Sequence, residues 1–238
     1  MKQMKKYKST IKYAFIASLP VCAGYVVLAI GFGLIMYDKG YSWLWSLAMS
    51  VFIYAGSLQY VGVGMLTAGA SFVTCALTSL MVNIRHLFYG VSMLEEYKKC
   101  KLEKPYVIFA LTDETYSLVC SADLPADVSK RAYFFFVSLF NQTYWVVGSV
   151  IGGLLGQVIP FDTTGIDFAM TALFIVVAVE QWEKASQHIS AITGFASAIV
   201  CLMIFGPDRF LIPTMILITI LLFAFKKTIL KKEGKGNE

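Results

Sequence analysis

The fold of this chain depends on the segment NIRHLFY, residues Asn83–Tyr89, which places charged and polar side chains within an apolar run. Arg85 and His86 lie in the second half of the run from Ala70 to Leu94. An ionisable side chain at the centre of a bilayer costs about 3 kcal/mol on insertion scales. Such a residue usually faces the interior of a helix bundle and marks a path for a substrate or an ion. The segment therefore predicts a polar site enclosed by helices.

The composition of the chain is that of a membrane protein. It has 238 residues, of which 58% are hydrophobic and 15% are charged. Average soluble domains carry about 25% charged residues, so the shortfall and the long apolar runs indicate an integral membrane protein. The apolar runs are continuous and not alternating, which favours helices over a β-barrel. We therefore predict an all-α integral membrane protein with a single transmembrane domain over residues 14–225.

The positive charge is concentrated at the two ends of the sequence. Residues 1–13 and 226–238 each hold five lysines, and the net charge is +5. Basic segments beside apolar spans usually mark the cytoplasmic side of a membrane. Both termini are therefore expected in the cytoplasm, the number of spans is expected to be even, and no nucleic-acid partner is expected.

The apolar runs give eight candidate spans, and seven or eight transmembrane helices are expected because the fourth run is weak. The runs cover residues 14–37, 43–66, 70–94, 106–122, 132–157, 168–182, 189–205 and 210–225. With eight spans, the loop Glu95–Lys104 would lie outside the cell, although its four lysines favour the inside. If the fourth run does not cross, this loop moves to the cytoplasmic side.

The second run is interrupted by polar and small residues at Ala55–Gln59, with two further glycines after them. Glycine weakens the interior of a helix. A broken helix that lines a cavity would explain the pattern, and Gln59 would then lie on a transport path. Close packing of two helices through small residues would explain it equally well.

Two polar faces run along the third span. Asn83, His86 and Gly90 share one face at helical spacing, and Arg85 lies on the neighbouring face. A polar wedge of this width indicates a helix that lines a wet path. Alternatively, the Arg85 side chain could extend along the helix to the acidic loop that begins at Glu95.

The fourth run carries the carboxylates that could balance Arg85. Asp113 and Glu114 fall in its middle, within the polar stretch Leu111–Tyr116. Such a stretch inserts into a membrane only if protein covers it, so we expect the two carboxylates to face Arg85 and the transport path. A short re-entrant or interfacial helix with a solvated acidic face is the alternative.

The fifth run contains Gly148, Gly152 and Gly156, a stripe suited to tight contact with another helix, which could come from a second chain. There is also a weak repeat at a shift of 120 residues: for example, Gly33-Leu34 matches Gly153-Leu154. The pattern allows two three-helix repeats joined by a linking helix, an arrangement that many transporters use.

Several classes of function are excluded by missing motifs. The five cysteines form no Cys-x-x-Cys pair, so no metal site is expected. The sequence has no phosphate-binding Gly-x-x-x-x-Gly-Lys-Ser/Thr loop, no serine elbow and no His-Glu-x-x-His motif. We therefore expect a protein that is not an enzyme, has no cofactor and draws energy from an ion or substrate gradient.

Four motifs together resemble the AzlC family of branched-chain amino acid exporters. They are Gly56–Gln59, Asn83–Tyr89, Thr112–Tyr116 and Gly165–Phe174, the last of which contains Asp167. The resemblance implies the large subunit of an exporter in the cytoplasmic (inner) membrane, which works with a small AzlD-like membrane subunit. It also implies leucine, isoleucine and valine as substrates, with methionine and analogues in some cases.

The chemistry of the residues fits such a substrate. A free amino acid is a zwitterion, so Arg85 could bind its carboxylate and Asp113 or Glu114 its ammonium group. Protons are the expected coupling ion, because His86 and the carboxylates can titrate. Together with these residues, Gln59, Asn83 and Asp167 are the candidates for the transport path. An uptake permease or a channel for another small polar solute remains the alternative function.

Overall fold

The computed structural model describes residues 2–158, except 121 and 123, residues 188–206, residues 210, 213, 214 and 216–224, and isolated positions between 168 and 183. The described residues form helices, and no strand occurs among them, which confirms the all-helical prediction. The chain packs as two compact units, residues Met1–Met170 and Thr171–Glu238. The first unit contains seven of the described helices, α1 to α7.

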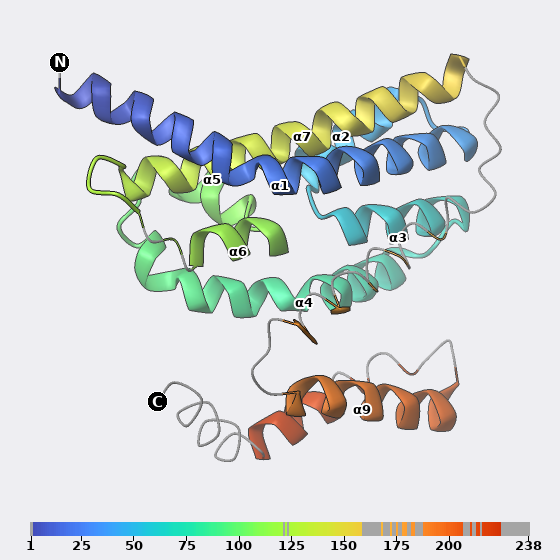
Figure 1. Ribbon diagram of the computed structural model, residues 1–238. Coiled ribbons are helices and arrows are strands. Elements are labelled where there is room, and N and C mark those ends of the chain that lie inside the picture. The colour runs from blue at the N-terminus through green and yellow to red at the C-terminus, as the bar shows by residue number, and fades with distance from the viewer. Residues whose placement is uncertain are drawn as a thin grey trace. The chain divides into compact units, whose positions relative to one another are not determined.

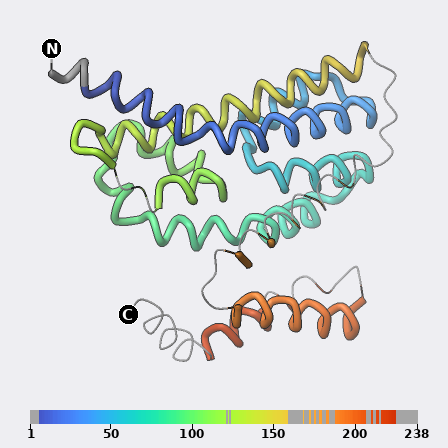
Figure 2. The backbone as a smooth tube through the Cα atoms, in the orientation of Figure 1, coloured from blue at the N-terminus to red at the C-terminus, as the bar shows by residue number. Residues whose placement is uncertain are grey.

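Two long helices, α1 (Lys2–Asp38) and α7 (Lys130–Val158), lie side by side along the whole first unit (Figures 1 and 2). They run in the same direction, because Thr10 bonds to Ser129 near their starts and Tyr37 packs on Gly156 near their ends. Both helices are long and apolar enough to cross a membrane. They form the frame against which the shorter elements pack.

The glycine stripe of α7 is filled by α1 of the same chain. A side chain at Gly152 would collide with the backbone of Ile30, and one at Gly148 would come within 2.7 Å of the Ala29 side chain. The suggestion that a second chain fills this stripe is therefore wrong. The close approach of two backbones needs small residues, and α1 supplies the second backbone.

The second apolar run forms two helices that turn back on each other, α2 (Trp43–Phe52) and α3 (Gly56–Thr67). The bend between them contains Tyr54, whose φ of +43° is a left-handed conformation that a continuous helix cannot accommodate. Of the two interpretations of this run, the structure shows the broken helix. α2 starts beside the end of α7 and runs towards its middle, and α3 then returns to the same end of the unit (Figure 1).

The third run forms one continuous helix, α4 (Phe72–Tyr97), as predicted. The hydroxyl of Ser71 caps its start by accepting a hydrogen bond from the Thr74 N–H at 3.2 Å. Its last turn lies beside the start of α7, where the Lys130 ammonium is 3.0 Å from a Glu96 carboxylate oxygen. α4 therefore runs the length of the unit in the direction opposite to α1 and α7.

The fourth run was predicted as a single span, and this is wrong. It forms α5 (Lys104–Phe109) and α6 (Asp113–Cys120), separated by a break at residues 110–112. Thr112 starts α6 by accepting a hydrogen bond from the Thr115 N–H, so the polar stretch begins a new helix instead of continuing the old one. α5 runs from the start of α7 towards its middle, and α6 returns, as contacts at Arg131, Asn141 and Tyr133 show.

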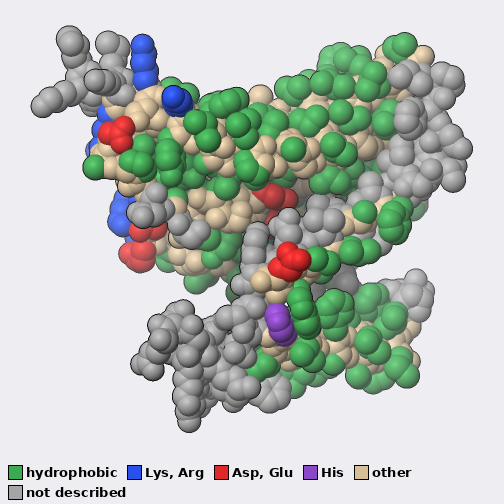
Figure 3. All heavy atoms as spheres, viewed as in Figure 1, with side chains coloured by type: hydrophobic (Ala, Val, Ile, Leu, Met, Phe, Trp, Pro, Cys, Tyr) green, Lys and Arg blue, Asp and Glu red, His purple; other side chains and the backbone are tan. Residues whose placement is uncertain are grey.

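The first unit therefore contains two helical hairpins. The first hairpin (α2 and α3) and the second hairpin (α5 and α6) start at opposite ends of the unit and meet near its middle. In this arrangement the loop after α4 lies at the same end as the N-terminus, where Lys6 bonds to the Ala126 carbonyl and Lys130 pairs with Glu96. Figure 3 shows Lys and Arg side chains gathered at this end. The loop Glu95–Lys104 thus lies at the same end of the first unit as the N-terminus, which agrees with the alternative in which the fourth run does not cross.

The second unit contains α9 (Ile189–Phe205), which begins and ends where the seventh span was predicted. Gly206, with φ of +72°, follows its last residue and stops the helix. The predicted span 168–182 and the basic tail 226–238 lie largely or wholly outside the described residues, whereas residues 213, 214 and 216–224 of the predicted span 210–225 are helical.

Candidate functional site

Near the middle of the first unit, Arg85 of α4 contacts both hairpins, one through an ion pair and the other through a hydrogen bond. Arg85 of α4 places Nη1 2.5 Å from the Oδ2 atom of Asp113, the first residue of α6. Its Nη2 donates a hydrogen bond of 2.6 Å to the Oγ atom of Ser57, in the first turn of α3. One guanidinium group therefore holds the inner ends of both hairpins, and Asp113 is the carboxylate that meets the sequence expectation.

The pair is only partly satisfied by protein atoms. The Arg85 side chain is 31% exposed and that of Asp113 is 20% exposed. The Nε atom of Arg85 and the Oδ1 atom of Asp113 are nevertheless inaccessible and lack a hydrogen-bond partner among the described residues. Most buried polar atoms in proteins are hydrogen-bonded, so unused donors and acceptors beside a charged pair suit a polar ligand.

His86 and Asn83 lie beside the pair on α4 and do not extend it. The Nδ1 atom of His86 is 3.2 Å from the carbonyl oxygen of Asn83, one helical turn away. The Oδ1 atom of Asn83 is buried and has no hydrogen-bond partner among the described residues. The next turn carries Tyr89, whose ring stacks on that of Tyr116 from α6 at 4.6 Å between centroids. This stacking holds α6 against α4 next to the ion pair.

Gln59 belongs to a different, fully buried network. Its Nε2 atom donates to the Oγ atom of Ser50 at 3.1 Å, and its Oε1 atom accepts from the indole N–H of Trp145 at 2.9 Å. Ser50 in turn donates to Ser149 at 2.9 Å. The network fixes the first hairpin to α7, so Gln59 positions the element that carries Ser57.

Glu114, the second carboxylate, points away from the ion pair towards α1. Its Oε2 atom accepts a hydrogen bond of 2.6 Å from the hydroxyl of Tyr25, which is also 2.8 Å from the Oγ1 atom of Thr112. No ion pair to Glu114 occurs in the described part of the chain. Adjacent carboxylates thus have different environments: Asp113 faces a cation, and Glu114 faces hydroxyl groups.

Sequence reasoning missed two of the groups at this site. Ser57 lies in the polar interruption of the second run, which was itself a usable signal. Tyr25 carries no such signal, because it is one hydroxyl in a long apolar span. Asp167 lies outside the described residues. Among the residues that the structure describes, no group of three His, Cys, Asp or Glu side chains could hold a metal ion.

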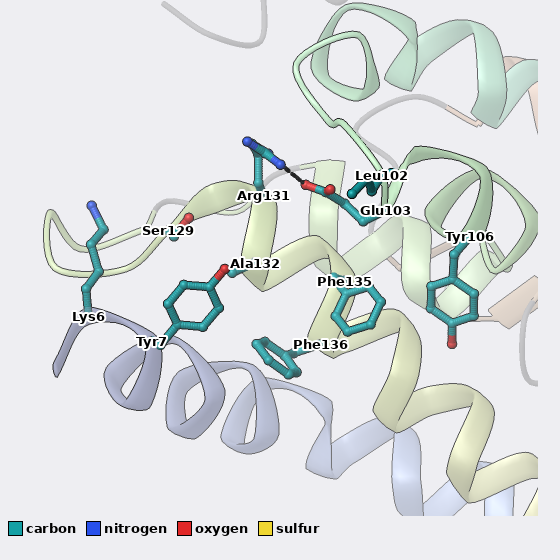
Figure 4. Close-up of a pocket in the computed structure, with 10 residues that line it drawn as sticks. All are labelled: Lys6, Tyr7, Leu102, Glu103, Tyr106, Ser129, Arg131, Ala132, Phe135 and Phe136. Atoms are coloured by element: carbon teal, nitrogen blue, oxygen red, sulfur yellow. Dashed lines mark hydrogen bonds and ion pairs between the residues drawn. The ribbon is translucent and has the colours of Figure 1, made fainter. Parts of the chain in front are cut away.

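A hollow of about 620 Å³ opens at the basic end of the unit, between the starts of α1, α5 and α7 (Figure 4). Lys6 and Arg131 line one part of it, and Tyr106, Phe135 and Phe136 form an aromatic wall. Glu103 also lines this hollow, and a hydrogen bond from its own backbone N–H lowers the pKa of its carboxyl group. The Arg131 guanidinium group, 2.5 Å away, lowers this pKa further. This acid is therefore ionised and neutralises one of the cations.

Comparison with known proteins identifies a close set of relatives. The sequence model of the family described as AzlC protein matches residues 20–159, which include both hairpins and the ion pair. The chain is 40% identical over 233 residues to the branched-chain amino acid transport protein AzlC of Bacillus subtilis, covering 98% of this chain and 92% of that protein. It is 31% identical over 176 residues to the inner membrane protein YgaZ of Escherichia coli, covering 70% and 71%. An uncharacterised membrane protein of Haemophilus influenzae is 41% identical over 212 residues, covering 89% and 87%. No solved structure matches.

Proposed function

The chain belongs to the AzlC family, and on this premise we propose that it is the large subunit of a secondary transporter that exports branched-chain amino acids across the cytoplasmic membrane. The name of the Bacillus subtilis relative supports the substrate class. The observation that carries the proposal is the position of Arg85, whose guanidinium group binds one hairpin through Asp113 and the other through Ser57. A ligand that competes for this cation would act on both hairpins.

We propose that α1, α4 and α7 cross the membrane and that the two hairpins enter it from opposite faces. At 10 and 12 residues, α2 and α3 are each shorter than the ~20 residues that a crossing helix needs. Broken helices are tolerated at membrane depth where protein or a water-filled cavity covers them. The basic end of the unit would then face the cytoplasm, in agreement with the distribution of Lys and Arg.

The substrate would be recognised by exchange of partners at the ion pair. A zwitterionic amino acid presents a carboxylate to Arg85 and an ammonium group to Asp113, so it replaces one internal pair by two pairs with the substrate. Neither charge is left unpaired during this exchange, which avoids the several kcal/mol that an isolated buried charge costs. A methylene group in an apolar pocket is worth only ~1–3 kcal/mol, so leucine, isoleucine, valine and methionine should all be accepted.

The energy source and the partner complete the proposal. Protons are the proposed coupling ion, since titratable side chains surround the site. A small AzlD-like membrane subunit is the proposed partner, because the short hairpins and their polar ends need cover that lipid cannot give. On α4, the side chains of Leu87, Phe88 and Val91 are 62%, 65% and 74% exposed and would suit contact with an apolar helix.

The test follows leucine leaving cells that have been loaded with a leucine-containing dipeptide. Three strains are compared, expressing this chain alone, the small subunit alone, and both together. We expect rapid appearance of leucine outside the cells only with both subunits. Full export by this chain alone would refute the two-subunit proposal. If both proteins are detected in the membrane but leucine is not exported, the proposed substrate class is refuted. Inward transport of external leucine would refute the proposed direction of transport.

A further inference from the structure

We propose that Glu114 is the site that binds and releases the transported proton, while Asp113 serves as the ion-pair partner of Arg85. This inference rests on the proposed transport function and assigns its coupling step to one side chain. The two carboxylates are neighbours in the sequence and begin the same helix, yet their surroundings separate them. Asp113 is 2.5 Å from a guanidinium nitrogen, whereas Glu114 accepts a hydrogen bond from the hydroxyl of Tyr25.

The first step of the argument concerns charge. A carboxylate that faces a fixed cation keeps its charge, because losing it would leave the cation buried and unpaired. A carboxylate without a cation inside a membrane protein is costly to keep ionised, so it takes up a proton readily. In the described part of the chain, Arg85 is committed to Asp113 and Ser57, and no basic side chain pairs with Glu114. Of the two acids, only Glu114 can change its charge without breaking an ion pair.

The second step concerns hydrogen bonds, since a proton site must be satisfied in both of its states. Tyr25 lies 2.6 Å from the Oε2 atom of Glu114 and 2.8 Å from the Oγ1 atom of Thr112. Thr112 is in turn 3.1 Å from Thr115, whose Oγ1 atom accepts a hydrogen bond from Asn141. Hydroxyl groups both donate and accept, so the Tyr25 hydroxyl can donate either to Glu114 or to Thr112.

The two states can be written in full. When Glu114 is ionised, Tyr25 donates to the carboxylate and Thr112 donates to Thr115. When a proton from water binds Oε2, the new O–H bond donates to Tyr25, which then donates to Thr112, and Thr112 donates to Thr115. Release of the same proton to water on the other side restores the first state. Tyr25 has a hydrogen-bond acceptor in both states, which a reversible proton site needs.

Among the residues that the structure describes, the groups around Glu114 contain no other acid without an ion-pair partner. The titratable and charged side chains that face it are Tyr25 of α1, Tyr54 of the first hairpin, Asp113 of α6 and Tyr89 of α4, with Arg85 and His86 next to them on α4. Phenol groups stay protonated throughout the physiological pH range, so the tyrosines cannot take the place of the carboxyl group. The backbone carbonyl of Asn83 holds the ring of His86 on α4 itself.

The decisive experiment separates proton coupling from substrate binding, using the full chain with its small subunit in vesicles. Glu114→Gln keeps the size and hydrogen bonding of the side chain and removes the titration. We expect this variant to lose at least tenfold of the leucine transport that a pH gradient drives, and to retain exchange of labelled for unlabelled leucine at equal pH. Glu95→Gln, at an exposed site on α4 next to Lys98, is the matched control and should transport like the wild type.

A second measurement reports on the proton directly. Infrared difference spectra of the wild type between high and low pH should contain a protonated carboxyl band that is absent from Glu114→Gln and present in Glu95→Gln. Persistence of this band in Glu114→Gln, or of gradient-driven transport, would overturn the assignment. Loss of both exchange and gradient-driven transport in a folded Glu114→Gln protein would also overturn it, because Glu114 would then bind substrate. A wild type that moves no leucine would instead refute the proposed function itself.

Discussion

The ion pair between Arg85 and Asp113 gives the most direct test of the site. Replacing Arg85 by alanine removes the ion pair at 2.5 Å and the hydrogen bond to Ser57 at 2.6 Å together. Breaking a fully buried pair from one side costs about 3–5 kcal/mol. The Asp113 side chain is 20% exposed, so water can relieve part of this cost, and we expect a loss of about 2–4 kcal/mol. Transport should be abolished, because the cation that binds the substrate carboxylate is gone.

The charge-reversed double variant Arg85→Asp with Asp113→Arg distinguishes stability from function. It rebuilds an ion pair of opposite polarity, so it should recover folding, but the substrate would meet each charge at the wrong end. Thermal unfolding of the purified protein measures the first property and export of leucine the second. The control is Lys98→Ala, which removes an exposed pair with Glu95, and such pairs are worth at most about 1 kcal/mol.

Three outcomes would refute this reasoning. Export near the wild-type level by Arg85→Ala would show that the guanidinium group does not bind substrate. Losses of stability that simply add in the double variant would show that the two side chains do not interact in the membrane. If Lys98→Ala lowered the stability as much as Arg85→Ala, burial would not make the Arg85–Asp113 pair contribute more to stability than an exposed pair.

Two further predictions test the arrangement of the helices. The first uses single cysteines introduced into a chain without its native cysteines and a membrane-impermeant reagent added from outside. Cysteines in place of Lys99 and Ala126 should not react, whereas a cysteine in place of Ala68 should react. Labelling at position 99 from outside would contradict the two-hairpin topology. Gly152→Ala should sharply lower the yield of folded protein, because the added carbon collides with the backbone of α1. Gly24→Ala, at a position with nothing within 4 Å, should be harmless, and equal yields of the two variants would argue against the close packing of α1 and α7.

Residues that the weak sequence repeat relates lie close together in the first unit. Residues about 120 positions apart face each other across the contact of α1 and α7: Thr10 bonds to Ser129, and Gly33 packs against Gly153. Two parallel repeats related by an axis between these helices would place equivalent residues in this way. Most of residues 159–187 lie outside the described residues and α9 belongs to the second unit, so the repeat as a whole stays a prediction.

The sequence by itself determined the class of the protein and the existence of a polar site. Low charge and continuous apolar runs predicted membrane helices, and the bounds of α4, α7 and α9 follow the predicted runs within a few residues. Arg85 predicted its own carboxylate partner, because an unpaired cation is too costly inside a membrane. These features depend on the free energy of transferring each segment out of water, which is a local property that the amino acids alone carry.

Only the tertiary structure decided whether an apolar run crosses the unit or turns back. The second and fourth runs have the composition of interrupted spans, and burial against other helices gives the same hydropathy to a crossing helix and to a hairpin. The structure also decided between Asp113 and Glu114, which are adjacent in the sequence but lie at different angles around α6. A helix rotates by about 100° per residue, so neighbours meet different partners, and the identity of those partners depends on helices that are distant in the sequence.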